Sequence, residues 1–208
     1  MFPNILPLAM INNNIYIKQI ILDKIYTTNN MKKIDQMKGV KNMATIKTTN
    51  RDGKYSDEYA FFDTINYIMA PHKTPHCCIG GHMIDPLDIP GSMKQVAIHY
   101  GKTNGVQLNH YILSFSPQET NDYKKVYTMA QQIASGIGRH FQTAFAVHED
   151  RPYLHIHFIV NRISYIDGHR WRGTRQEFSS LCNDIRSVLQ SYHIPTLQYI
   201  PVKASHKY

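Results

Sequence analysis

Hydrophobic and polar residues alternate along some stretches of the 208-residue chain and recur three and four residues apart along others. The first spacing predicts strands and the second predicts helices. Predicted strands cover 44–49, 106–116, 142–149, 153–164 and 197–202, and predicted helices cover 56–70, 90–100, 120–140 and 175–192. A loop is predicted between the first two helices. Because strands and helices do not strictly alternate, the pattern is typical of an α+β sandwich, with a mainly antiparallel sheet and helices packed on it.

The first predicted helix begins at Ser56, a residue type that is favoured at helix N-caps. Its apolar stripe is predicted to consist of Tyr59, Phe62, Ile65 and Met69. At about 100° per residue, Tyr67 lies roughly 140° from Phe62 and shares its face with Asp63 and Thr64. The side chain of Tyr67 is therefore not needed for the main core contact.

Residues 1–42 differ from the rest of the chain in composition. They are rich in Asn, Ile and Lys, lack a clean period, and carry six lysines against two aspartates, which is half of the formal net charge of +8. From Met43 onward the pattern becomes regular. We therefore expect a poorly ordered extension or a mispredicted start over 1–42, followed by one folded domain over 43–208.

The overall charge and the cysteines narrow the class of protein. A net charge of +8 favours acidic partners, of which nucleic acid is the most obvious. Three cysteines, two of them adjacent, do not resemble a disulfide framework, so we expect a reducing compartment and a cytoplasmic location. The most apolar early stretch is interrupted by charged residues too soon to span a bilayer, so no membrane association is expected.

The strand within HEDRPYLHIHFIVNR, residues 148–162, has two different faces. The face predicted to pack under helices carries Leu154, Ile156, Phe158 and Val160. The other face carries Tyr153, His155, His157, Ile159 and Asn161. This second face is too polar for a core surface, and we expect it to line a cleft.

Three histidines of this segment are spaced to bind one metal ion. His155 and His157 share a strand face, and His148 would reach in from the end of the adjoining strand. Imidazole nitrogen suits Mn, Fe, Co, Ni and Zn, whereas Mg prefers oxygen ligands. Three protein ligands leave positions open for a substrate, as catalytic sites require. Asp150 would accept a proton from the second ring nitrogen of one ligand and so fix its tautomer. An isolated His-x-His pair is more often a surface feature without consequence, and this reading stays open from spacing alone.

Three stretches of the chain, in the right order, resemble the motifs of conjugative and mobilisation relaxases, which are His-hydrophobe-His tyrosine endonucleases. His148-x-Asp150, His155-x-His157 and Asn161 resemble their third motif. DTINYIMAPHKT at 63–74 resembles their first motif, a helix that bears the nucleophilic tyrosine. MKQVAIHYGKTNGVQLNHYILSFSPQET at 93–120 resembles the segment between them. The similarity covers about 43–195, with one departure: many members carry another His or Asn where Tyr153 stands.

The resemblance implies a function and a role for each motif. Tyr67 would attack one DNA strand at the origin of transfer of a plasmid or integrative element, forming a 5′-phosphotyrosine and leaving a free 3′-hydroxyl. A divalent ion, Mg or Mn, would be held by the three histidines, with Asp150 and Asn161 behind them. An accessory mobilisation protein and a coupling protein are the implied partners. Tyr55, Tyr59 and Tyr153 are the alternative nucleophiles.

Basic and aromatic residues around the histidine strand are candidates for binding single-stranded DNA, because phosphate pairing and base stacking are what such binding requires. These candidates are Lys73, Arg151, Arg162, Arg170, Trp171 and Arg172. A solvated hairpin with a half-buried tryptophan explains the same residues equally well. Three other functions stay open at this point: a rolling-circle replication initiator, a metal-dependent nuclease that uses water, and a non-catalytic single-stranded DNA-binding module.

Overall fold

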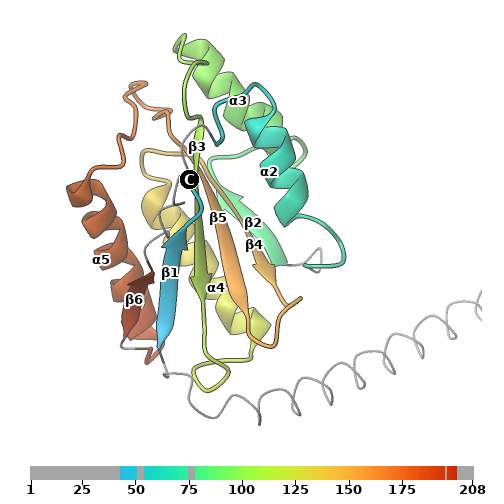
Figure 1. The fold of residues 1–208 in the computed structure, drawn as a ribbon, viewed down its shortest axis with the longest axis vertical. Coiled ribbons are helices and arrows are strands. Elements are labelled where there is room, and N and C mark those ends of the chain that lie inside the picture. The colour runs from blue at the N-terminus through green and yellow to red at the C-terminus, as the bar shows by residue number, and fades with distance from the viewer. Residues whose placement is uncertain (1–42, 51–53, 75–77, 195, 201–208) are drawn as a thin grey trace, which may run out of the picture. The chain divides into compact units, whose positions relative to one another are not determined.

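The computed structural model describes residues 43–50, 54–74, 78–194 and 196–200. The described chain forms one six-stranded sheet with helices on both faces (Figure 1). In chain order the elements are β1 (Ala44–Thr48), α2 (Ala60–Ile68), β2 (Ile79–His82), α3 (Ile89–His99), β3 (Leu108–Ser114), α4 (Tyr123–Ile137), β4 (Thr143–His148), β5 (His155–Asn161), α5 (Arg175–Ser191) and β6 (Leu197–Ile200). The predicted extension over 1–42 lies outside the described residues.

The strand order is β2-β4-β5-β3-β1-β6, so the histidine strand β5 lies inside the sheet with partners on both sides. Only the β1–β6 pair is parallel among the described strands, and the other four pairs are antiparallel. The prediction of an α+β fold with a mainly antiparallel sheet is therefore confirmed.

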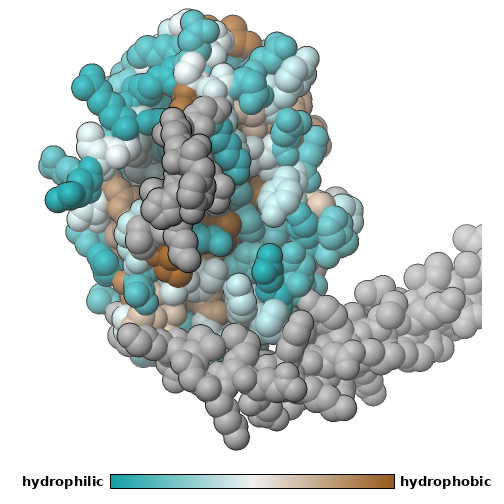
Figure 2. All heavy atoms as spheres, viewed as in Figure 1, coloured by the Kyte–Doolittle hydropathy of each residue, from teal (hydrophilic) through white to brown (hydrophobic). Residues whose placement is uncertain are grey.

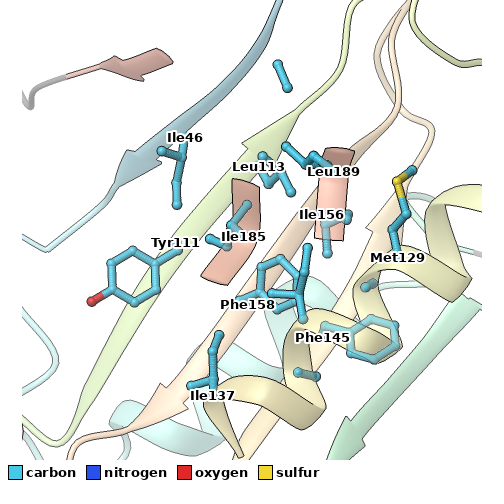
Figure 3. Close-up of a cluster of buried hydrophobic side chains, with 14 of the residues drawn as sticks. Ile46, Tyr111, Leu113, Met129, Ile137, Phe145, Ile156, Phe158, Ile185 and Leu189 are labelled. Carbon is cyan, nitrogen blue, oxygen red and sulfur yellow. The ribbon is translucent and has the colours of Figure 1, made fainter. Parts of the chain in front are cut away.

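The larger core lies between the sheet and helices α4 and α5. Apolar residues of α4 recur three and four positions apart, which puts them on the face that contacts the sheet. Figure 3 shows side chains from β1, β3, β4, β5, α4 and α5 converging there, among them Phe145, Ile156 and Phe158. Both helices begin with a side-chain cap: Asp122 caps α4, and Thr174 forms a capping box with Glu177 at α5.

A second, smaller core lies on the opposite face, between the sheet and helices α2 and α3. Phe61, Ile65 and Ile68 of α2 pack there against Ile159 of β5. The prediction that the face of Ile159 lines a cleft is wrong for that end of the strand. Ile159 and Asn161 are buried there, because α2 and α3 cover this part of the face.

The buried stripe of α2 also differs from the prediction. Its buried residues are Ala60, Phe61, Thr64, Ile65 and Ile68, whereas Tyr59 is 60% exposed. The helix begins at Ala60 rather than Ser56. Tyr55 has a positive φ of 63°, and the residues after it form a turn in which the Asp57 carboxylate accepts a hydrogen bond from the Tyr59 amide. The true core face is therefore rotated by about one residue from the expected one.

Strand β2 replaces part of the predicted loop. Its sequence, IGGH, lacks the alternation of apolar and polar residues that predicts a strand. It forms because its backbone pairs with β4 at the edge of the sheet, and its glycines fit where larger residues would not. A Cβ at Gly80 would meet the Phe145 ring at 2.5 Å.

On the side of the molecule shown in Figure 2, hydrophilic colours cover most of the described surface, and apolar residues form small separate patches. Within the described residues, none of the helices combines the length and the apolar character that crossing a membrane requires.

Candidate active site

The three predicted metal ligands come together at one end of β4 and β5. His148 is the last residue of β4 and pairs with His155, the first residue of β5, while His157 lies opposite Ala146. One ring nitrogen from each histidine lies within 4.8 Å of the other two.

The triad is buried, and burial keeps its imidazoles neutral. His148, His155 and His157 are 1%, 6% and 3% exposed. Burial, and after it the neighbouring His148, lower the pKa of His155 to about 4. Burial also lowers the pKa of His148 and, most strongly, that of His157. At neutral pH the three rings therefore offer lone pairs rather than charges, and the donor set fits a divalent transition ion.

His148 is held by the helix above it. Its Nε2 donates to the carbonyl oxygen of Ile68, the last residue of α2, at 2.7 Å. Because the proton then sits on Nε2, the lone pair of Nδ1 is left for an ion. The hydrogen bond thus selects the tautomer that can act as a ligand.

His157 is oriented by a chain of hydrogen bonds that could not be predicted from the sequence. Its Nδ1 lies 2.7 Å from Nε2 of His110 on β3. Nδ1 of His110 lies 2.9 Å from the Tyr55 hydroxyl, which lies 2.7 Å from Oγ1 of Thr49. When each group donates to the next, the chain ends at Thr49, whose hydroxyl donates to the His110 carbonyl oxygen at 3.5 Å. The proton of His157 is then on Nδ1, and its Nε2 is left free for an ion.

His155 contacts one oxygen atom at each ring nitrogen. Its Nδ1 is 3.5 Å from the Tyr153 carbonyl oxygen, and its Nε2 is 3.6 Å from a carboxylate oxygen of Asp150. The Asp150 carboxylate thus lies near His155, beyond direct hydrogen-bond distance. Whichever nitrogen holds the proton, the other is left for the ion.

Tyr67 extends from α2 toward the triad. Its ring centroid is 6.0 Å from that of His157, with the two planes at 72°, and its side chain is 52% exposed. Both rings line a hollow of about 410 Å³, together with Asp63, Thr64 and His110. A phenol, an imidazole cluster and open space for a substrate thus meet at one place.

The alternative tyrosines are placed differently. Tyr55 is 7% exposed, and its hydroxyl is engaged in the chain to His110. Tyr59 does not line the hollow. Tyr153 lies beside His155, with ring centroids 5.8 Å apart, but it comes from the loop between β4 and β5 rather than from a helix.

Two of the predicted DNA-binding residues lie beside this site. Nζ of Lys73 is 3.4 Å from the centre of the Tyr67 ring, so its charge is held directly against the phenol. Arg151 is exposed in the loop between β4 and β5, next to Asp150. Its charge is close enough to His155 to lower the pKa of that imidazole, after the larger effects of burial and His148.

Other predicted residues have structural roles instead. Asn161 does not support the triad: it is fully buried at the far end of β5, where its amide donates to Met93 O and Gln142 Oε1. Trp171 is 7% exposed and packs in the larger core, so it presents no face on which a base could stack. The Arg170 guanidinium donates to three backbone carbonyls, those of Lys102, Asn104 and Val106.

Arg162 and Arg172, the last two predicted DNA-binding residues, line a separate hollow on the opposite face of the sheet. The arginine cluster that the sequence indicated is therefore divided among three places. Strand alternation explains the division, because Arg162 follows the core-facing residues of β5 rather than its histidines.

The comparisons with known proteins agree with this geometry. Residues 67–194, more than half of the chain, match the family described as relaxase, MobA/VirD2-like, nuclease domain. One Staphylococcus aureus protein named Protein rlx is 31% identical over 93 residues, which cover 44% of this chain and 29% of that protein. Another protein of the same name and organism is 26% identical over 106 residues, covering 50% of this chain and 32% of that protein.

The aligned part thus spans about a third or less of each of these relatives. No solved structure matches the chain. The family match covers β2 to α5 and includes Tyr67 and all three histidines of the triad. The chain belongs to the MobA/VirD2-like relaxase nuclease-domain family.

Proposed function

We propose that the protein nicks one strand of DNA for mobilisation, through a covalent bond between Tyr67 and the 5′ side of the break. The observation that carries the proposal is the position of the Tyr67 ring, edge-on to His157 and in the same hollow. The family membership supports the choice of DNA as substrate. The origin of transfer, an accessory mobilisation protein and a coupling protein follow from that membership and belong to the proposal.

The phenol oxygen of Tyr67 attacks the phosphorus atom of the scissile phosphodiester. The bond from phosphorus to the 3′ oxygen breaks, and the phenol proton is passed through solvent to that oxygen, which leaves as a hydroxyl. The energy of the broken bond is retained in the phosphotyrosine, so the reverse reaction can rejoin the strand without an external energy source.

The histidine triad and Lys73, close to Tyr67, have separate tasks in this reaction. His148, His155 and His157 would hold a divalent ion, which would polarise a non-bridging phosphate oxygen and neutralise charge at phosphorus. Nitrogen donors favour Mn over Mg. Lys73, against the Tyr67 ring, stabilises negative charge on the phenol as its proton leaves.

The test is covalent capture of a labelled single strand that carries the nick site. With Mn²⁺ present, the wild-type protein should keep the label through denaturing electrophoresis, and Tyr67→Phe should not. Tyr59→Phe, on the same helix but outside the hollow, is the matched control and should behave as wild type. Because Tyr67→Phe removes one exposed oxygen, its unfolding free energy should change little.

A label retained by Tyr67→Phe would assign the nucleophile to another tyrosine, and Tyr153 would be the next to replace. Cleavage without any covalent label would identify water as the nucleophile.

A further inference from the structure

A second hollow of about 420 Å³ lies on the face of the sheet opposite the triad. Its volume is within the range of small-ligand sites, roughly 300–1,000 Å³. Three arginines line it: Arg162, Arg172 and Arg175. None of the described residues that line it is acidic, and none of these arginines has a carboxylate within ion-pair distance in the described part of the chain.

The start of α5 adds to this positive potential. Thr174, the N-cap, and Arg175, the first residue of this 17-residue helix, both line the hollow. Gly173, just before them, has a positive φ of 74°, which turns the chain into the helix at the rim. The Glu177 carboxylate in the same first turn accepts from the amides of Arg172 and Thr174 and offsets part of the positive end of the helix dipole, so the arginines supply most of this potential.

An unpartnered donor in the wall points independently to a ligand. Asn109 lines the hollow, is 5% exposed, and accepts a hydrogen bond from Asn50 through its oxygen. Its amide nitrogen, Nδ2, has no hydrogen-bond partner within the part of the chain that the structure describes. A buried donor without an acceptor costs roughly 1–3 kcal/mol, which an acceptor oxygen in the hollow would recover.

Arg162 has spare donors as well. Its Nε donates to the carbonyl oxygen of Trp171, which fixes the guanidinium, and its two terminal nitrogens have no hydrogen-bond partner among the described residues. Burial lowers the pKa of Arg162, so its charge is incompletely compensated by solvent. Phe178 and Tyr199 line the same hollow, with their ring centroids 4.8 Å apart. Charged donors and aromatic rings together are the combination that a nucleotide requires.

We propose that this hollow binds a phosphate group of a nucleic-acid strand. The proposal rests on the proposed function, because the strand is the DNA whose scissile bond would lie at the triad. The two hollows are back to back: Thr49 and His110 line the first, while their chain neighbours Thr48 and Asn109 line the second. One strand that passes around the end of β1 would occupy both.

Binding of two probes, inorganic phosphate and a short oligothymidylate, tests the proposal by NMR. The signals to follow are the backbone amides of Gly173 and Thr174 and the side-chain amide of Asn109. Both probes should shift them, and the oligonucleotide should do so at a much lower concentration than phosphate. If both probes shifted the signals at the same concentration, the ligand would be free phosphate rather than a nucleic-acid strand. If neither probe shifted them, the hollow would not be a binding site.

Charge-matched variants make the test specific. The double variant Arg172→Gln/Arg175→Gln should weaken oligonucleotide binding and reduce the slope of log affinity against log salt by roughly one for each arginine. The control, Lys124→Gln/Arg139→Gln, removes two exposed charges outside the hollow and should leave the slope unchanged. Equal weakening in both double variants would overturn the proposal.

Failure of this site is distinguishable from failure of the proposed function. If the oligonucleotide shifts only signals around Tyr67 and His157, the second site is wrong and DNA binding at the triad stands. If it shifts neither set, both are wrong.

Discussion

Some histidines of the candidate site could be predicted from the sequence and others could not. His155 and His157 could be assigned to one face from strand alternation alone, and a short loop keeps His148 near them. His110 could not be found in this way, because its partner His157 is 47 residues distant and only the pairing of β3 with β5 brings them together. Trp171 was misassigned for the opposite reason: its neighbours in sequence are basic, but its neighbours in space are apolar.

His110 should control metal affinity without touching the ion. Replacing it with Leu leaves Nδ1 of His157 without its partner, and affinity for Mn²⁺ should fall by about 10–100-fold, as for other residues that orient metal ligands. His110→Gln, whose side chain can still accept from His157, should recover most of that loss. Calorimetric titration with Mn²⁺ measures both, and equal affinities in the wild type and the Leu variant would show that the bond is unimportant.

The buried histidines should also make the metal-free protein sensitive to mild acid. Burial lowers the pKa of His110 to about 3 and that of His155 to about 4, so the folded state stays neutral where the unfolded chain takes up protons near pH 6.5. The unfolding free energy should therefore be constant above about pH 7 and fall as the pH drops from about 6.5 toward 5. Urea titrations in EDTA would measure this, and His110→Gln should show a smaller fall; a flat profile would contradict it.

At the scale of elements, most of the helices and strands follow from local pattern, and the exceptions depend on partners. Two helices and five strands lie within the predicted ranges, namely α4, α5, β1, β3, β4, β5 and β6, and α3 begins one residue before its predicted range. Strand β2 could not be predicted, because its pairing with β4 supplies what its own IGGH sequence lacks. Helix α2 begins later than predicted because the backbone at Tyr55 has a positive φ, which the residue types there do not predict.

Helix α4 supports the larger core from its N-cap. The Asp122 carboxylate accepts from the amides of Lys124 and Lys125 at 2.9 and 3.2 Å. Asp122→Ala should lower the unfolding free energy by about 1 kcal/mol, whereas Asp122→Asn, which keeps the acceptor, should cost much less. Urea denaturation distinguishes the two variants, and an equal loss in both would mean that charge rather than the hydrogen bond matters.

At the scale of the whole molecule, the sheet separates two cores of unequal size. The larger core stabilises the fold, while the smaller one positions α2 and Tyr67 over the histidines. All of these parts lie between β1 and β6, and the family match begins at residue 67.

We therefore expect residues 1–42 to be dispensable. A chain that starts at Met43 should fold with the same unfolding free energy and form the covalent DNA adduct at the same rate as the full chain. Solubility, urea denaturation and adduct formation measured side by side would check this. Loss of soluble protein in the shorter chain would assign the first 42 residues a part in folding.

The hydrogen bond from His148 to Ile68 joins an ion ligand to the helix that carries the nucleophile. Ion occupancy and helix position would therefore form one thermodynamic linkage, and linkage is reciprocal. If ion binding favours attachment of a DNA end to Tyr67 through the position of α2, attachment would raise the affinity for the ion by the same factor. An enzyme that stays joined to its cleaved strand would then travel with its ion still bound, ready for the rejoining step at the destination.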